Sequence, residues 1–104
     1  MEMQNLLSET LAKLAENHKR IEDVAYCECD GYFFGWQTFA QIADKEYDDC
    51  YGFVEVNLSL KIHGSDWWLE RHEYDGAECW VFRNLPVKPI HKTDKPNIFK
   101  KGWQ

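Results

Sequence analysis

The first 84 residues of this 104-residue chain contain no proline, and all three prolines lie within residues 85–104. Proline interrupts helices and strands because it fixes φ and lacks a backbone N–H. Its absence leaves residues 1–84 free to form one acidic domain of regular structure. Its clustering in residues 85–104 predicts a basic, extended C-terminal tail, which either packs back on the domain or stays detached from it.

Long apolar runs are also missing, since no stretch approaches the roughly 20 apolar residues of a membrane-spanning helix. The N-terminus, Met-Glu-Met-Gln-Asn, is polar and lacks the basic region and apolar core of a targeting segment. We therefore expect no membrane contact and a cytoplasmic protein, in which Cys27, Cys29, Cys50 and Cys79 remain reduced.

Motifs for catalysis are absent as well. The chain has no glycine-rich phosphate loop, no nucleophile elbow and no paired His-Glu zinc motif. His72 and Glu73 are adjacent, so on a strand they point to opposite faces and do not act together. A dyad of Cys79 and His72 requires a perturbed pKa, which a sequence does not show. We therefore expect no enzymatic activity and no cofactor.

Metal binding has weak support from the cysteine spacing. Cys27 and Cys29 are two residues apart, which places both thiols on one face of a strand but is not the Cys-x-x-Cys spacing of structural zinc sites. His72 and Cys79 are predicted neighbours across a hairpin, so a site built from these four residues is the metal-binding alternative. Small buried thiols are the favoured interpretation, and no metal is expected.

A β-hairpin around Asp75-Gly76 is the strongest structural signal that is present. Asp-Gly suits a two-residue type I′ turn, and β-favouring and aromatic residues flank it on both sides. This turn predicts the cross-strand pairs Tyr74–Ala77, His72–Cys79, Glu70–Val81 and Trp68–Arg83 on one face, and Glu73–Glu78, Arg71–Trp80, Leu69–Phe82 and Trp67–Asn84 on the other. The second face is the buried one, with Arg71 paired with the two glutamates and stacked on Trp80.

The remaining patterns predict an α+β fold. Leucines at helical spacing, among them Leu11, predict a helix over residues 5–20 that packs its apolar face in the core, with Asn5 as its N-cap. A shorter helix follows at residues 36–44, with Ile42 among its core residues. One strand is predicted at residues 21–29, which lead to a second Asp-Gly turn. Residues 54–62, where apolar and polar residues alternate, predict either one half-buried strand or two short strands in sequence. The prediction is a single small domain with two helices packed on an antiparallel sheet of about four to five strands.

Charge is unevenly distributed along the chain. Residues 1–84 carry seven basic and seventeen acidic side chains, a net charge of −10, whereas residues 85–104 carry five lysines and one aspartate, a net charge of +4. An acidic domain argues against direct nucleic-acid binding and favours a protein partner with a basic surface. The alternative is that the acidic residues only keep the protein soluble.

Two places in the sequence are candidate partner-binding sites. One is the polar connection 45–52 with its flanking aspartate, where aromatic residues alternate with carboxylates, a mixture that suits an interface to a basic groove. The other is the outer face of the hairpin, where Trp68 and Arg83 are predicted to form an exposed stacking pair, unless the tail buries the tryptophan. The candidate residues are Asp44, Glu46, Tyr47, Asp48, Asp49, Tyr51, Trp68 and Arg83.

Residues 66–80, D-W-W-L-E-R-H-E-Y-D-G-A-E-C-W, resemble a hairpin motif of small uncharacterised proteins of bacteriophages and prophages. The resemblance extends weakly to Asp30-Gly31-Tyr32 and to Trp36. It implies a phage or mobile-element context and a location in the host cytoplasm. By analogy, a small acidic protein in that context inhibits a host nucleic-acid-handling or defence protein, as an anti-CRISPR does. The alternatives are a self-associating structural or virion-assembly protein, such as a homodimer, and a small metal-binding module.

Overall fold

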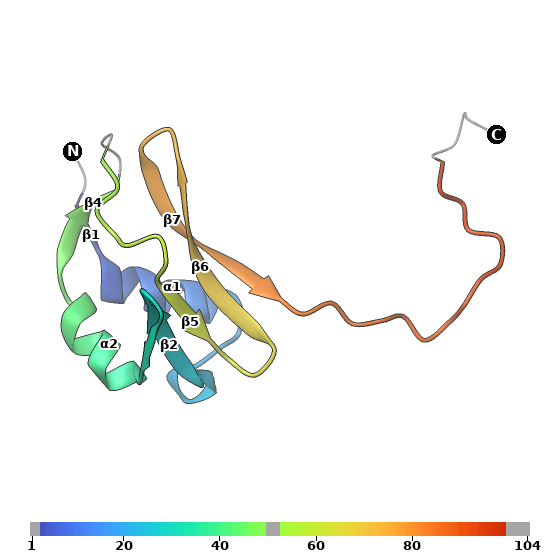
Figure 1. Ribbon diagram of the computed structural model, residues 1–104, viewed down its shortest axis with the longest axis horizontal. Helices are drawn as coiled ribbons and strands as arrows, with labels where there is room; N and C mark the ends of the chain where they lie inside the picture. The colour runs from blue at the N-terminus through green and yellow to red at the C-terminus, as the bar shows by residue number, and fades with distance from the viewer. Residues whose placement is uncertain (1–2, 50–52, 100–104) are drawn as a thin grey trace.

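The computed structural model describes residues 3–49 and 53–99 (Figure 1). Within these ranges the chain forms seven strands, two α-helices and one 3-10 helix, η1. In chain order the elements are β1 (Met3–Asn5), α1 (Leu6–Glu16), η1 (Ile21–Asp23), β2 (Tyr26–Cys29), β3 (Tyr32–Phe34), α2 (Trp36–Ala43), β4 (Glu46–Asp48), β5 (Lys61–His63), β6 (Trp67–Tyr74) and β7 (Ala77–Asn84).

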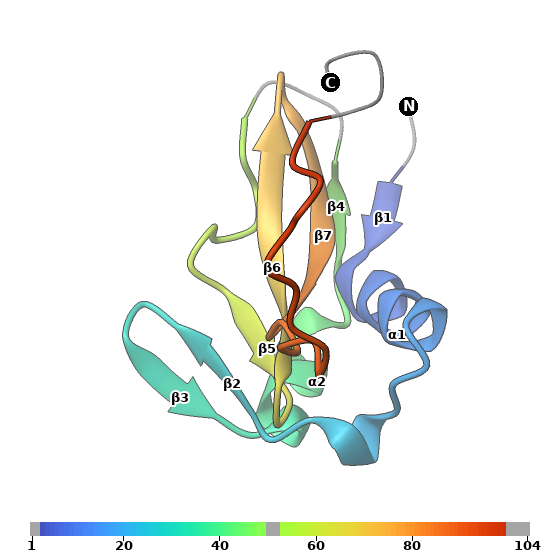
Figure 2. The same ribbon diagram turned by 90° about the vertical axis from the view of Figure 1, so that its right-hand side faces the viewer.

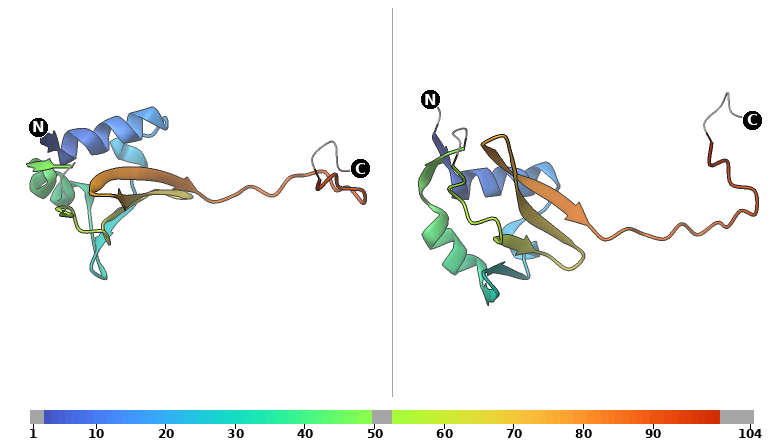
Figure 3. Two further views of the ribbon diagram at one scale, coloured as in Figure 1. Left: turned by 90° about the horizontal axis from the view of Figure 1, so that it is seen from above. Right: turned by 45° about the horizontal axis from the view of Figure 1, so that its top comes forward.

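The strands form two antiparallel sheets, and the predicted α+β fold is confirmed. The larger sheet has the order β3-β2-β5-β6-β7, and β1 pairs with β4 in a separate ribbon. Helix α1 lies on one side of β6 and β7 (Figure 3). In Figure 2 the β2–β3 hairpin splays away from β6 and β7. We call the face of the larger sheet that α1 covers the inner face, and the opposite face the outer face.

Both predicted Asp-Gly turns are present. Asp75 and Gly76 have φ values of 53° and 87°, and Asp30 and Gly31 have 55° and 84°. These positive values are those of a type I′ turn, which matches the right-handed twist of the paired strands. All eight predicted pairs between β6 and β7 are confirmed. Trp67, Leu69 and Trp80 are buried on the inner face, as the alternation predicted.

Helix α1 is shorter than predicted, and its buried face differs. The side chain of Asn5 caps the helix by accepting a hydrogen bond from the Ser8 backbone N–H at 2.9 Å, which confirms the predicted N-cap. The helix ends at Glu16 rather than at residue 20. Leu11, predicted to be in the core, is exposed, whereas Thr10 is fully buried. The hydroxyl group of Thr10 accepts a hydrogen bond from Trp80 Nε1 at 2.8 Å, which ties α1 to the inner face of the sheet.

The strand predicted at residues 21–29 is only half present. Its first part is the short helix η1, and β2 starts at Tyr26. The Asp23 carboxylate accepts a hydrogen bond from the backbone N–H of Arg20 at 2.8 Å. Such a local bond between side chain and backbone competes with strand formation.

The strand predicted at residues 54–62 is wrong over most of its length, because only residues 61–63 form β5. The carboxylate of Glu78 accepts hydrogen bonds from the backbone N–H groups of Glu55 at 2.6 Å and Val56 at 3.1 Å. A side chain from β7 therefore occupies the donors that a neighbouring strand would use. Val56 and Leu60 are buried, as the alternation predicted, but Leu58 is exposed.

Residues 85–99, which we call the C-terminal arm, form no helix or strand and extend away from the rest of the protein (Figure 1). The first alternative for the tail, packing back on the domain, is not found for these residues. Val87 and Ile90 are 89% and 91% exposed, and Ile98 and Phe99 are exposed as well.

Candidate protein-binding surfaces

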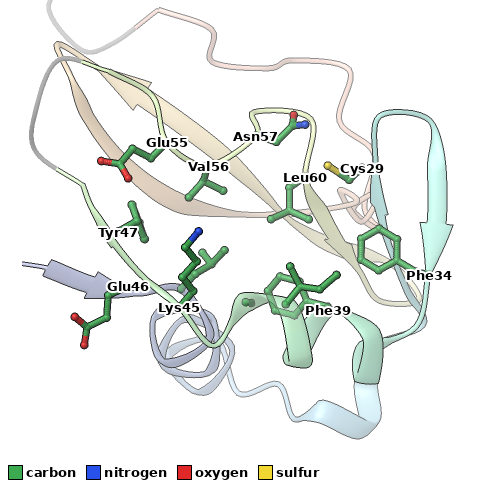
Figure 4. A pocket seen from close by; sticks show the side chains of 13 residues that line it. Cys29, Phe34, Phe39, Lys45, Glu46, Tyr47, Glu55, Val56, Asn57 and Leu60 are labelled. Carbon is green, nitrogen blue, oxygen red and sulfur yellow. The ribbon is translucent and has the colours of Figure 1, made fainter.

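An open cavity of about 420 Å³ lies between α2, β4, the β2–β3 hairpin and the segment of residues 55–60 (Figure 4). Helix α2 lines it because the helix turns Phe39 and Ala43 inward. Most of the lining is apolar, and a cavity of this size accepts several side chains of a ligand. Its apolar lining includes Phe34, Phe39, Ile42, Val56 and Leu60. Ile42, predicted to be in the core, is instead 72% exposed at this cavity.

Carboxylates lie on the rim of the cavity. Glu46 and Glu55 are exposed, and Figure 4 shows both carboxylates at its outer edge, pointing away from the apolar floor, whereas the Lys45 amino group points into the cavity. Lys45 also lines the cavity, and its amino group is the only basic group in the lining among the described residues. Asp44, which immediately precedes Lys45 in the chain, is exposed and accepts a hydrogen bond from Asn5 Nδ2 at 3.1 Å. We call this cavity, with its rim of Glu46 and Glu55, the acidic groove.

Two further acidic candidates, Asp48 and Asp49, are the last residue of β4 and the residue after it. Asp48 pairs with Met3 across the β1–β4 ribbon, and the backbone carbonyl of Asp49 accepts a hydrogen bond from the Glu78 N–H at 2.9 Å. Both aspartates are half-buried. Neither aspartate lines the acidic groove. Tyr51 lies outside the described residues.

Tyr47 is buried, with only 6% of its surface exposed, so its predicted position on an exposed loop is wrong. Its hydroxyl group donates a hydrogen bond to Glu9 Oε1 at 2.5 Å and accepts one from Arg71 NH2 at 2.9 Å. Burial and then the bond to the Glu9 carboxylate raise the pKa of this hydroxyl group. The ring helps to line the groove, but the hydroxyl group belongs to the core beneath it.

Arg71 is the centre of that core, and its side chain is fully buried. Its guanidinium group lies 3.4 Å from Glu9 Oε2, 3.6 Å from Glu78 Oε1 and 4.8 Å from the Trp80 ring centre. The predicted contacts with Glu78 and Trp80 are confirmed. The predicted contact with Glu73 is wrong, because that side chain accepts a hydrogen bond from the Gly76 N–H at 2.8 Å.

On the outer face, Trp68 and Arg83 are cross-strand neighbours as predicted. They meet through a carboxylate rather than by stacking. Trp68 Nε1 donates to Glu70 Oε1 at 2.7 Å, and Arg83 Nε lies 3.4 Å from Glu70 Oε2. Trp68 is half-buried and Arg83 is exposed. The indole ring is therefore held in a defined orientation on a face that α1 does not cover.

Other aromatic residues extend this outer face, and the sequence reasoning missed them. Tyr26 stacks on His63 with ring centres 4.6 Å apart and meets the edge of Phe33 at 6.4 Å. Glu28 Oε1 holds His63 Nε2 at 2.6 Å. Tyr26, His63, Trp68 and Arg83 share one row across the sheet. Finding this row from the sequence would have required the register in which β2 pairs with β5. No sequence motif links these two strands.

No protein-family model, curated protein or solved structure matches this chain. Among the described residues, no helix is both long and apolar enough to cross a membrane.

The four residues of the metal-binding alternative do not come together. Cys27 pairs with Ile62 in β5, which pairs with Leu69, so Cys27 lies on the inner face. His72 and Cys79 are neighbours on the outer face, and both are exposed. Burial raises the pKa of Cys27 to about 12, which keeps this thiol protonated. Within residues 3–49 and 53–99, no three His, Cys, Asp or Glu side chains are placed to hold a metal ion.

Trp68→Phe is expected to raise the pKa of Glu70. The hydrogen bond from Trp68, followed by the contact with Arg83, lowers the pKa of this carboxyl group, and phenylalanine has no N–H to donate. A carboxyl group whose pKa falls on folding stabilises the protein above its unfolded pKa, and this contribution is lost as the pH falls through the folded value. NMR titration of the Glu70 carboxyl carbon measures the shift. Trp36→Phe, a matched change on α2, should leave the titration unchanged, and an unchanged midpoint in Trp68→Phe would contradict the assigned bond.

Proposed function

We propose that this protein is a non-catalytic binding protein. Its acidic groove would bind a basic segment of a host protein and so cover the nucleic-acid-binding surface of that protein. The observation that supports this proposal is the apolar cavity with Glu46 and Glu55 on its rim. An apolar floor binds the aliphatic part of a partner side chain, while carboxylates at the rim pair with its cationic groups. A lysine- or arginine-rich segment has this combination of an aliphatic stem and a charged end.

The charge of the whole domain favours the same kind of partner. Residues 1–84 carry a net charge of −10, which attracts a basic surface over distances of about 8 Å at physiological salt. A protein that covers such a surface excludes nucleic acid from it, because the two compete for the same cations. Inhibition of a nucleic-acid-handling or defence protein, in the manner of an anti-CRISPR, follows from that competition. The phage context rests on the resemblance of residues 66–80.

The outer face offers a second contact area. Trp68 is oriented by Glu70, and an oriented tryptophan beside an arginine is typical of residues that contribute strongly to protein interfaces. The groove and this face have different lining residues. We therefore treat Trp68 and Arg83 as a separate site, to be tested by its own variants.

Affinity capture from host lysate, with the bound proteins identified by mass spectrometry, tests the proposal. The wild-type protein is expected to retain a nucleic-acid-binding protein, and added nucleic acid should release it. Glu46→Lys/Glu55→Lys should lower the retained amount at least tenfold, because each exposed carboxylate becomes a like charge to the partner. Raising the salt concentration should weaken the wild-type complex.

Glu16→Lys/Glu22→Lys is the matched control, since it changes the net charge equally at two exposed residues on α1 and η1. Equal loss in both double variants would show that only net charge matters and would contradict a role of the groove. Capture that survives the groove variant but fails with Trp68→Ala would assign binding to the outer face instead.

A further inference from the structure

The C-terminal arm has the chemistry that the acidic groove accepts. Residues 85–99 carry three lysines and one aspartate. Its side chains Val87 and Ile90 are almost fully exposed. An extended segment with proline at residues 86 and 89 favours the polyproline II conformation, which has three residues per turn. Val87 and Ile90 are three residues apart and therefore project from the same side of the arm, flanked by Lys88 and Lys92.

The direction of the arm leads it away from the groove of its own chain. The backbone N–H of Leu85 donates to the Asp66 carbonyl oxygen at 2.8 Å, which holds the start of the arm against the β5–β6 connection. Pro86 and Pro89 restrict φ just beyond this point and oppose a tight reversal. Figures 1 and 3 show the arm leaving from the end of β7, while α2 and β4, which line the groove, lie at the opposite end of the protein.

We propose that the arm of one copy docks in the acidic groove of a second copy. This inference rests on the groove of the proposed function and names the chain's own arm as a ligand of that groove. Val87 and Ile90 would pack on the apolar floor, and Lys88 and Lys92 would pair with the Glu46 and Glu55 carboxylates at the outer edge, away from the Lys45 amino group inside the cavity. Two copies that exchange arms form a closed, two-fold symmetric dimer, because each supplies one arm and one groove.

If the arm docks in the acidic groove, dimer formation competes with binding of the host protein for that groove. A groove that is filled by an arm is not available to a basic segment of another protein, so partner binding requires release of the arm. The competition also specifies the chemistry of the partner segment. It should carry two aliphatic side chains three residues apart with lysine or arginine beside them, as the arm does.

Sedimentation equilibrium of the purified full-length chain over a range of concentrations tests the exchange of arms. The wild-type protein is expected to form a dimer whose dissociation constant rises with salt. A groove variant, Glu46→Lys/Glu55→Lys, and an arm variant, Val87→Asp/Ile90→Asp, should each raise that constant at least tenfold. All four positions are exposed, so circular dichroism and thermal unfolding should match those of the wild-type protein.

Mixing the two variants distinguishes the exchange of arms between two copies from the docking of an arm in the groove of its own chain. The groove variant keeps its arm and the arm variant keeps its groove, so the mixture should form a heterodimer with one arm–groove contact. Adding Lys88→Glu/Lys92→Glu to the groove variant should restore the homodimer, since the two charges are then exchanged. Glu16→Lys/Glu22→Lys serves as the control with unchanged arm and groove.

Three results would overturn the inference: a wild-type protein that is monomeric at all concentrations, a dimer that both variants leave intact, or no heterodimer in the mixture. If the wild-type chain is monomeric while the groove variant still loses its captured partner, only the arm inference fails. If the arm-dependent dimer forms but the groove variant captures as well as wild type, the proposed function fails and the arm inference stands.

Discussion

Replacing Arg71 with methionine is expected to lower the free energy of unfolding by about 3–5 kcal/mol. The guanidinium group is buried between the carboxylates of Glu9 and Glu78 and donates to the Tyr47 hydroxyl oxygen. Methionine is close in volume but carries no charge and no donor, so two carboxylates in a largely buried site lose their counter-ion. Removing one partner of a buried ionic group costs more than the group contributes as a whole, because the remaining charges stay desolvated.

Urea denaturation monitored by tryptophan fluorescence measures this effect. His72→Ala is the matched control, because His72 is the next residue on β6 and is exposed on the outer face. A surface change of this kind is expected to stay within about 0.5 kcal/mol of the wild-type protein. A loss below about 1 kcal/mol in Arg71→Met would show that water reaches the carboxylates and that the group is not the ionic centre described above.

Glu78→Ala is expected to have an effect of similar size, about 3–5 kcal/mol, for two reasons. The substitution removes a buried carboxylate that lies 3.6 Å from Arg71 NH2. It also removes the acceptor for the backbone N–H groups of Glu55 and Val56, and an unpaired buried donor costs about 1–3 kcal/mol. The second loss loosens the segment that carries part of the acidic groove.

Urea denaturation and hydrogen exchange together separate the two effects of Glu78→Ala. The amides of Glu55 and Val56 should exchange faster than the loss of global stability alone explains. Glu73→Ala is the control, since Glu73 lies opposite Glu78 in the hairpin but only caps the Gly76 N–H. Its expected cost is about 1 kcal/mol. Equal costs for both substitutions would contradict the central role of Glu78.

The parts of the fold that sequence patterns predicted are those set by neighbours along the chain. The Asp75-Gly76 turn positions β6 against β7, and each further pair then follows from the two-residue period of a strand. Asn5 caps α1 through a residue only three positions away. Interactions over such short separations depend on local geometry, which amino-acid type alone largely determines.

The same kind of pattern failed where a distant side chain competed with it. Residues 54–62 alternate as regularly as a strand, but Glu78 from β7 takes two of the backbone donors. Tyr47 resembles an exposed interface residue by its acidic neighbours, but Arg71 and Glu9 draw its hydroxyl group into the core. In both segments, a buried ionic group outweighs local preference, because leaving it unpaired costs several kcal/mol.

The sequence by itself determined the α+β class, the long hairpin with its register, and the opposite net charges of residues 1–84 and residues 85–104. Only the tertiary structure decided which residues surround Arg71 and where the acidic groove lies. The groove combines side chains from α2, β4, the β2–β3 hairpin and the segment before β5. Arg71 and Glu9 are 62 residues apart in the chain. Contacts over such separations form only when several elements have packed, so no local pattern encodes them.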